Sequence, residues 1–324
     1  MDGRSAEAGT SAGEIKRKGQ DAKLTFQEKL LQILTKEQVL VNEPMSRHTT
    51  FQVGGPADYY LTPREEQIVS VTRLCRKEQI PVQVIGNGSN LLVGDKGIRG
   101  AVLEIGPQDG KVYAEGDMVY AQAGVSLARA AQEAARASLS GLEFASGIPG
   151  TVGGAVVMNA GAYGGEMKDV VKWARILDRN GQIHRLETEE LKLSYRHSVV
   201  QDMDGIVLSA AFQLTPGDET MIRAKMELLR NQRMQKQPLE YPSAGSTFKR
   251  PEGYFAGKLI MDSGLRGYRV GGAQVSEKHC GFVINAGGAT AADILQLIRD
   301  VQDTVQKKFG VRLETEVRLI GEFY

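Results

Sequence analysis

Apolar residues recur at helical spacing in several stretches of the chain, and residues suited to helix ends flank these stretches. Thr62 and Pro63 precede one of them as a predicted N-cap and first helical residue. Ser126 precedes an alanine-rich stretch as a predicted N-cap, and Thr290 with Asp293 predicts a capping box. The helices predicted on this basis cover residues 24–38, 62–75, 126–138, 219–237, 256–262 and 290–310.

The long predicted helix over residues 219–237 ends at Pro238, and the composition of the chain changes there. Met226, Leu229 and Met234 are predicted to form the inward face of this helix. We therefore expect a new domain to begin near this helix.

Short segments with strand-like sequences lie between the predicted helices. They cover residues 81–85, 101–105, 119–123, 173–178, 183–186 and 206–214. Asn180 and Gly181 separate two of them, and this dipeptide between apolar runs is the strongest short hairpin signal. The sequence over residues 311–320 predicts a closing strand. Because hairpins are mixed with helices, the pattern predicts an α+β fold rather than a regular parallel α/β sheet.

Two glycine-rich stretches interrupt this pattern. The first, residues 86–90, follows a predicted strand, and the second covers residues 146–165. Glycine permits close approach of the backbone to a ligand, and successive N–H groups in such turns bind anions. Either stretch alone is equally well interpreted as a tight connection between strands. Two of them together favour one long ligand with a phosphate bridge, and a dinucleotide is the obvious candidate.

The first glycine-rich stretch is not a Rossmann turn. A Rossmann fingerprint requires a third glycine at position 91 and a helix after it. Leu91 occupies that position, and a strand-like sequence follows. We therefore predict a phosphate-binding loop between two strands.

The composition narrows the class of protein. The 324 residues are 41% hydrophobic, which is enough for two or three domains with ample core. A net charge of +1 with dispersed basic residues indicates neither a nucleic acid nor an anionic membrane as partner, and no apolar run is long enough to span a bilayer. The two cysteines, Cys75 and Cys280, exclude a disulfide framework and fit a reducing cytoplasm.

Two further features of the composition limit the interpretation. Residues 1–22 are polar and lack the apolar region of a signal peptide, so we predict a disordered tail. No group of cysteines and histidines has the spacing of a zinc site, so we predict no metal.

Three polar residues, Arg196, Ser246 and Glu316, are candidates for chemistry. Each also has a structural interpretation. A lone arginine is usually a solvated charge, a serine beside glycine is usually part of a turn, and a glutamate in an alternating strand usually faces water. None of the three would support a catalytic function alone.

Five motifs, taken in order along the chain, resemble a known family. They are GNGSN (86–90), SGIPGTVGGAVVMNAGAYGGE (146–166), SYRHS (194–198), SAGSTFKRP (243–251) and LETEVRLIG (313–321). The set resembles the UDP-N-acetylenolpyruvoylglucosamine reductase (MurB) family, and the resemblance extends from about residue 25 to residue 324. It implies an FAD-binding domain of the p-cresol methylhydroxylase/vanillyl-alcohol oxidase type and a smaller α+β substrate-binding domain.

The resemblance also implies a reaction. In this family NADPH passes a hydride to FAD, and the hydride then reaches the methylene carbon C3 of an enolpyruvyl UDP-sugar. Protonation at C2 completes UDP-N-acetylmuramate, a precursor of peptidoglycan, and no metal ion takes part. Ser246 falls on the family's proton donor. Arg196 and Glu316 fall on its other catalytic positions, where they would stabilise the developing enolate.

Binding residues follow from the same resemblance. The residues predicted to bind FAD without a covalent link are Gly86, Asn87, Gly88, Ser89, Asn90, Leu91, Ser146, Gly147, Ile148, Pro149, Gly150, Gly153, Gly154, Ala155, Asn159, Gly161 and Ala162. Tyr163, Lys236 and His279 are predicted to contact the substrate, Lys236 through its phosphates. The implied partners are NADPH and UDP-N-acetylenolpyruvoylglucosamine in the cytoplasm, with no obligate protein partner.

Domain limits and departures complete the comparison. We predict an N-terminal joining segment over residues 23–55, the FAD-binding domain over 56–217, the substrate-binding domain over 218–310, and a strand over 311–324 that returns to the active site. Arg250 replaces an asparagine of one branch of the family. The stretch between Arg196 and Ser246 is short and lacks an insert with a tyrosine that closes over substrate. The chain therefore resembles the shorter, type II branch.

Two other classes of function remain open at this point. An oxygen-using flavin oxidase on the same fold would be re-oxidised rapidly by air without a UDP-sugar. A catalytically silent nucleotide-binding regulator would be colourless after gentle purification. The combination of Arg196, Ser246 and Glu316 argues against both.

Overall fold

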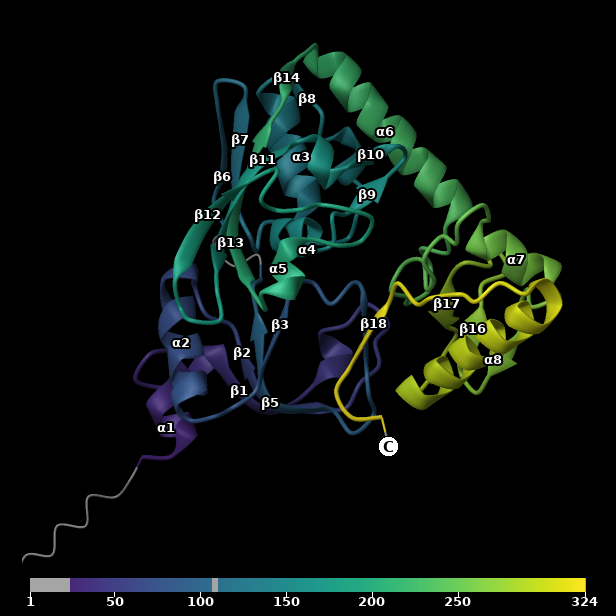
Figure 1. Ribbon diagram of the computed structural model, residues 1–324, viewed down its shortest axis with the longest axis horizontal. Helices are drawn as coiled ribbons and strands as arrows, with labels where there is room; N and C mark the ends of the chain where they lie inside the picture. Colours follow the sequence, from purple (N-terminus) through teal and green to yellow (C-terminus); the bar gives the residue numbers. More distant parts are fainter. Residues whose placement is uncertain (1–23, 107–109, 324) are drawn as a thin grey trace, which may run out of the picture.

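The computed structural model describes residues 24–106 and 110–323, and its larger lobe begins with a mixed sheet (Figure 1). The strands of this sheet are β1 (Val39–Pro44), β2 (Pro56–Leu61), β3 (Val82–Ile85) and β5 (Ile98–Glu104). β1 pairs antiparallel with β2, whereas β2 and β3 both pair parallel with β5. The predicted disordered residues 1–22 lie outside the described residues.

Two helices pack beside this sheet. The first ends earlier than predicted, and the second begins later than predicted. They are α1 (Phe26–Leu30) and α2 (Glu65–Lys77). The helix predicted over residues 24–38 is too long, because Thr35 caps a separate 3-10 turn over Lys36–Gln38. The predicted N-cap at Thr62 is also wrong. Arg64 is the N-cap of α2, and its backbone N–H donates to the Gln67 side chain at 2.9 Å.

A second, antiparallel sheet completes the larger lobe. Its strands are β6 (Val112–Glu115), β7 (Met118–Gln122), β11 (Val171–Leu177), β12 (Ile183–Glu187) and β13 (Ile206–Gln213), in the order β12–β11–β13–β7–β6. The hairpin predicted at Asn180 and Gly181 is confirmed, because β11 pairs antiparallel with β12 across it. Antiparallel hairpins mixed with helices confirm the predicted α+β class.

Two helices pack against this sheet and share its core. They are α3 (Leu127–Arg136) and α4 (Val152–Val157). Ser126 caps α3 as predicted, through a hydrogen bond from the Arg129 backbone N–H. α4 forms within the second glycine-rich stretch because Thr151 caps it and buried Val152 and Val156 anchor it. Short elements connect these parts: β8 (Leu139–Ser140), β9 (Gly161–Ala162), β10 (Gly165–Glu166), α5 (Val199–Asp202) and β14 (Thr215–Pro216).

The long helix α6 (Glu219–Lys236) leads from the larger lobe to a smaller one, along the edge of the molecule in Figure 1. Ile222 is buried, and Met226 packs partly against the core of the larger lobe. Met234 is 44% exposed, so its predicted inward position is wrong. The reason is that the first half of α6 packs beside α3 and the turn Glu143–Ala145, whereas its C-terminal half extends toward the smaller lobe (Figure 1).

The smaller lobe contains two helices and a three-stranded antiparallel sheet. Its elements are α7 (Ala256–Asp262), β15 (Arg269–Val270), β16 (Ala273–Val275), β17 (Val283–Asn285) and α8 (Ala291–Phe309). The predicted capping box of Thr290 and Asp293 is confirmed, and Gly310 ends α8 in the left-handed conformation. Phe51 and Leu92 of the larger lobe belong to the apolar core of the smaller one.

The two lobes are also joined by hydrogen bonds. The Asp95 carboxylate accepts the backbone N–H groups of Ala291 and Ala292, each at 2.8 Å, at the start of α8. An anionic side chain at this end of a helix also interacts favourably with the helix dipole. The Asn285 amide donates to the Phe51 carbonyl oxygen at 3.1 Å. The larger lobe therefore fixes the orientation of the smaller one.

The closing segment is mostly not a strand, contrary to the prediction for residues 311–320. β18 covers only Arg318–Ile320 and pairs parallel with β4 (Leu91–Val93). Before β18, the backbone is held by the smaller lobe: Lys249 N–H donates to the Glu314 carbonyl oxygen at 2.8 Å. The segment thus runs from one lobe to the other. The predicted domain limits stay predictions.

Candidate active site

A cavity of about 500 Å³ lies where the two lobes and the closing segment meet. Both glycine-rich stretches line it, together with the loop before α7 and the end of α6. The three candidate catalytic residues, Arg196, Ser246 and Glu316, also line it. Residues from three distant parts of the sequence therefore converge on one site.

Arg196 and Glu316 form a close pair in this cavity. The Arg196 Nε donates to Glu316 Oε1 at 2.6 Å, and the two side chains are only 19% and 16% exposed. Burial raises the pKa of the Glu316 carboxyl, and the nearby charges of Arg196 and Lys249 oppose this rise. A raised pKa makes protonation of the Glu316 carboxyl less costly at neutral pH than it is for a solvent-exposed glutamate.

Arg196 is held at the corner of a tight turn. Ser194 and His197 exchange backbone hydrogen bonds at 3.1 Å, and Arg196 has a φ of 56°, in the left-handed region. The Asn159 side chain donates to the Ser194 carbonyl oxygen at 3.0 Å. A strained backbone held by surrounding contacts is common at functional sites. The turn therefore presents the guanidinium to the cavity in a fixed position.

Ser246 stands on a loop that is tied directly to Glu316. The next residue, Thr247, donates its N–H to the Gly281 carbonyl oxygen and accepts the Glu316 N–H on its own carbonyl, both at 2.9 Å. Within the described residues, no group forms a hydrogen bond with the Ser246 hydroxyl. The hydroxyl is therefore available to a ligand in the cavity.

The first glycine-rich stretch is tied to the same segment. The Asn90 side chain donates to the Glu316 carbonyl oxygen at 3.1 Å, and Arg318 N–H donates to the Asn90 carbonyl oxygen at 3.0 Å. This loop connects β3 to β4 with no helix after it, as predicted. One short segment thus positions Glu316 against both the first glycine-rich stretch and the Ser246 loop.

The first loop also has the features of a phosphate site. In the part of the chain that the structure describes, none of the five backbone N–H groups from residue 86 to residue 90 donates a hydrogen bond. Consecutive unpaired N–H groups that face a cavity bind anionic oxygens. Gly88 has a φ of 59°, and a Cβ there would overlap the His48 carbonyl oxygen, so glycine is required to form this loop. The loop therefore fits the diphosphate of a dinucleotide.

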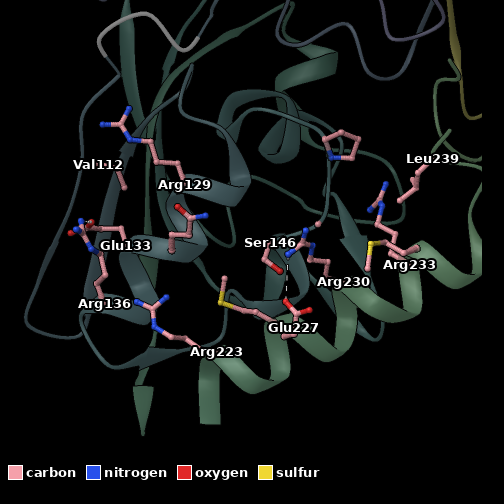
Figure 2. Close-up of a pocket in the computed structure, with 15 residues that line it drawn as sticks. Val112, Arg129, Glu133, Arg136, Ser146, Arg223, Glu227, Arg230, Arg233 and Leu239 are labelled. Atoms are coloured by element: carbon pink, nitrogen blue, oxygen red, sulfur yellow. Dashed lines mark ion pairs between the residues drawn. The ribbon is translucent and has the colours of Figure 1, made fainter. Parts of the chain in front are cut away.

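Most residues predicted to bind the cofactor line the cavity, and three do not. Ser146 and Gly147 line a neighbouring groove (Figure 2). Asn159 is fully buried, and its amide supports the turn at Ser194 and pairs with Glu166 at 2.8 Å. Asn159 therefore lies outside the cavity lining, and its amide stabilises the turn that contains Arg196.

None of the three residues predicted to contact substrate lines the cavity. Tyr163 is 42% exposed, and Lys236 is exposed at the end of α6. His279 packs against Phe282, and its Nδ1 accepts the Gly281 N–H at 3.1 Å. Their roles stay predictions. Arg233 and Gln237, which the sequence analysis did not select, line the cavity instead. Their spacing of four residues could have indicated that the two side chains share one side of the end of α6, which is not the side of Lys236.

Comparisons with known proteins agree with this geometry. Residues 57–187 match a model of an FAD binding domain, and residues 237–320 match the C-terminal domain of UDP-N-acetylenolpyruvoylglucosamine reductase. The reductase of that name from Agathobacter rectalis is 58% identical over 92% of this chain and 99% of the relative. The one from Lachnoclostridium phytofermentans is 56% identical over 91% and 97%. The crystal structure of MurB from Thermus caldophilus is 38% identical, with a TM-score of 0.73 over 85% of this chain and 97% of that chain.

The fold and the cavity define an FAD-dependent oxidoreductase whose smaller lobe matches the C-terminal domain of the reductase. More specifically, the chain belongs to the UDP-N-acetylenolpyruvoylglucosamine reductase family. It is therefore a flavoprotein reductase of peptidoglycan synthesis that takes its reducing equivalents from NADPH. No helix in residues 24–106 or 110–323 is both long and apolar enough to cross a membrane. The same residues contain no group of three or more His, Cys, Asp or Glu side chains that could hold a metal ion.

The raised pKa of Glu316 predicts how its contribution to stability depends on pH. A carboxyl whose pKa is higher in the folded state stabilises the fold below its unfolded pKa of about 4.3, and this contribution is lost as the pH rises through the folded value. Glu316→Gln mimics the neutral form at every pH. We expect wild type and Glu316→Gln to have similar unfolding free energies near pH 4, and wild type to become the less stable of the two toward pH 7. Urea unfolding at matched pH values measures the difference. A difference that does not change with pH would contradict the raised pKa.

Proposed function

We propose that Arg196, Ser246 and Glu316 catalyse the reduction of the enolpyruvyl ether of UDP-N-acetylenolpyruvoylglucosamine to UDP-N-acetylmuramate, in the cytoplasm. The observation that carries this proposal is their convergence on one cavity that both glycine-rich stretches also line. The two glycine-rich stretches would hold FAD, which would supply the hydride chemistry between NADPH and the methylene carbon of the substrate. The protein must then stabilise the negative charge that develops on the enolpyruvyl group and supply a proton to C2.

Arg196 stabilises negative charge on the substrate carboxylate. As the methylene carbon becomes a methyl group, charge develops toward C2 and the carboxylate. A fixed guanidinium beside that group lowers the barrier most when it is already oriented and shielded from water. The close pair with Glu316 and the tight turn supply this orientation. Glu316 in its neutral form would also donate a hydrogen bond to the same developing charge.

Ser246 donates the proton to C2. A hydroxyl is a weak acid, but the enolate that it meets is a strong base, so the transfer is chemically reasonable. The Ser246 hydroxyl lines the cavity without a hydrogen-bond partner in the described chain. One hydride and one proton are then added across the double bond, and NADPH is oxidised to NADP⁺.

The position of each added hydrogen tests this proposal. The enzyme is first reconstituted with 5-deaza-FAD, whose transferred hydrogen is carbon-bound and does not exchange with solvent as the N5–H of reduced FAD does. In D₂O with unlabelled NADPH, we expect one deuterium at C2 of the product and none in the new methyl group. With NADPH deuterated at the transferred position in H₂O, the deuterium should be in the methyl group. NMR of the purified product measures both. Solvent deuterium in the methyl group would show that protonation takes place at C3 and would overturn the assignment.

FAD is expected to be held without a covalent bond. Neither glycine-rich stretch contains a histidine or cysteine that could form a link to the flavin. The purified protein should be yellow, and acid precipitation should release FAD into the supernatant. Flavin that stays with the pellet, or FMN in place of FAD, would be the opposite result.

A further inference from the structure

Arg196 has a backbone conformation that the rest of the chain must stabilise. It is the third residue of the four-residue turn from Ser194 to His197, whose first and last residues exchange backbone hydrogen bonds. A φ of 56° at this position suits glycine and is uncommon for any other residue. Glycine, however, would remove the guanidinium from the cavity. The turn therefore depends on contacts with other segments to keep an arginine in this conformation.

Gln201 makes one of these contacts. Its side-chain amide nitrogen, Nε2, donates to the Arg196 carbonyl oxygen at 3.2 Å. Among the described residues, no other group donates to that oxygen. Gln201 lies on the short helix α5, is partly buried, and lines the active-site cavity. The backbone of Arg196 is therefore tied to a side chain five residues further along the chain.

The same amide also holds the end of α4. Gln201 Nε2 donates to the Val157 carbonyl oxygen at 2.8 Å, and the fully buried Ser198 donates its hydroxyl to the same oxygen at 2.8 Å. Val157 is the last residue of α4, so its carbonyl has no partner within the helix. A glutamine amide has two N–H groups. Gln201 therefore directs one to the Arg196 turn and one to the end of α4.

Asn159 links the same two segments from the other end of the turn. It follows α4, is fully buried, and donates to the Ser194 carbonyl oxygen at 3.0 Å. Its side-chain oxygen accepts the Lys168 N–H at 2.9 Å, which fixes the direction of the amide. Asn159 and Gln201 therefore fasten the first and third residues of the turn to the end of α4, within the second glycine-rich stretch.

We propose that Gln201 is a positioning residue for Arg196, because it holds the turn against α4 and so keeps the guanidinium where charge develops on the substrate. This inference rests on the proposed function, in which Arg196 stabilises negative charge on the enolpyruvyl group. A cation stabilises such charge best when it needs no rearrangement during the reaction. No such charge develops while NADPH reduces the flavin. Gln201 is therefore required only for the second half-reaction, in which the UDP-sugar re-oxidises the flavin.

NMR of the FAD-loaded protein tests whether Gln201 holds the turn. The Arg196 Nε–H donates to Glu316 at 2.6 Å, and its signal is assigned by its loss in Arg196→Lys. Gln201→Met removes the amide and keeps the length of the side chain. We expect hydrogen exchange of this N–H to become about ten-fold faster in Gln201→Met, the scale set by the loss of one hydrogen bond. Exchange at the wild-type rate would overturn the proposal.

Two further variants are compared with Gln201→Met. Gln201→Lys keeps a side chain that donates hydrogen bonds, so its exchange rate should be closer to that of wild type. Gln38→Met is the matched control, because the Gln38 amide also donates to two acceptors and does not line the cavity. The acceptors are the Thr62 carbonyl oxygen at 2.8 Å and Gln67 Oε1 at 2.9 Å. Gln38→Met should leave the exchange rate unchanged, and an effect as large as that of Gln201→Met would contradict the proposal.

Stopped-flow flavin absorbance tests the consequence for the reaction. In Gln201→Met, re-oxidation by the UDP-sugar should slow about ten-fold, the same scale as the exchange effect. Reduction by NADPH and the KM for the UDP-sugar should stay within a few-fold. Equal slowing of both half-reactions, a rise in KM alone, or loss of FAD would overturn the proposal, because each would mean that the amide serves α4 or a ligand directly.

The double variant shows whether the effect passes through Arg196. In the Arg196→Lys background, Gln201→Met should slow re-oxidation little further, because the two substitutions act on one interaction. Effects that multiply would contradict the proposal. An unchanged rate in Arg196→Lys alone would refute the proposed catalytic role of Arg196, whereas the exchange rate of its N–H decides separately whether Gln201 holds the turn.

Discussion

Ser246→Ala is expected to separate the two half-reactions of the enzyme. Reduction of the bound flavin by NADPH requires no proton at C2, so its rate should change little. Re-oxidation by UDP-N-acetylenolpyruvoylglucosamine should slow by about 10²-fold or more, the range for loss of a general acid. Stopped-flow flavin absorbance measures both directions. Ser246 lies on an exposed part of its loop with no hydrogen bond to lose in the described chain, so misfolding is not expected.

Ser246→Cys gives the matched comparison for this result. A thiol is a stronger acid than a hydroxyl, so the cysteine should recover part of the rate of the second half-reaction. Equal slowing of both half-reactions in Ser246→Ala would mean that Ser246 positions the flavin. No slowing in either would mean that water or another group protonates C2.

Gly154→Val is expected to give a folded protein that no longer binds FAD. Gly154 lies in the first turn of α4 and is exposed to the cavity. Apart from its chain neighbours and the backbone of α4 itself, the nearest atom to an added Cβ is Thr151 Oγ1 at 3.5 Å. The valine side chain would therefore fill cavity space rather than disturb the protein. The visible spectrum and the released FAD measure binding, and urea unfolding measures the fold. Full flavin content in Gly154→Val would show that this part of the cavity does not hold the cofactor.

Two other substitutions show whether the effect is local. Ala224→Val places the same side chain at an exposed position of α6 that lines neither the cavity nor the neighbouring groove, and FAD content should stay full. Gly153→Val should instead destabilise the protein by about 1–3 kcal/mol. An added Cβ at Gly153 would lie 2.9 Å from Ala123 Cβ and 3.3 Å from its carbonyl oxygen. We therefore expect Gly153 to be required for packing of α4 against Ala123, and Gly154 for binding of the cofactor.

Local signals predicted much of the fold. Ser126, Thr290 and the Asn180–Gly181 dipeptide each act within a few residues of chain, so the sequence contained the whole signal. The closing segment was predicted wrongly because its hydrogen-bond partners are distant in sequence. The Thr247 carbonyl oxygen accepts the Glu316 N–H. The alternation of apolar and polar residues in the closing segment does not show that its backbone pairs with a loop about 70 residues away.

The candidate site divides in the same way. Motif order selected Arg196, Ser246 and Glu316, and the structure brings them to one cavity. Arg233 and Gln237 were missed because they lie in no motif, and only their spacing of four residues indicates that they share one side of the end of α6. Asn159 was predicted to bind the cofactor because it lies among glycines, yet its amide braces the turn that presents Arg196.

The visible spectrum of the holoenzyme without oxygen tests the central claim most directly. Addition of one equivalent of NADPH should bleach the flavin absorbance, and the bleached state should persist. UDP-N-acetylenolpyruvoylglucosamine should then restore the absorbance within the time of a turnover, with formation of one equivalent of UDP-N-acetylmuramate. Flavin that stays bleached after this addition, or that recovers rapidly in air without any UDP-sugar, would contradict the assignment of this site to the reductase reaction.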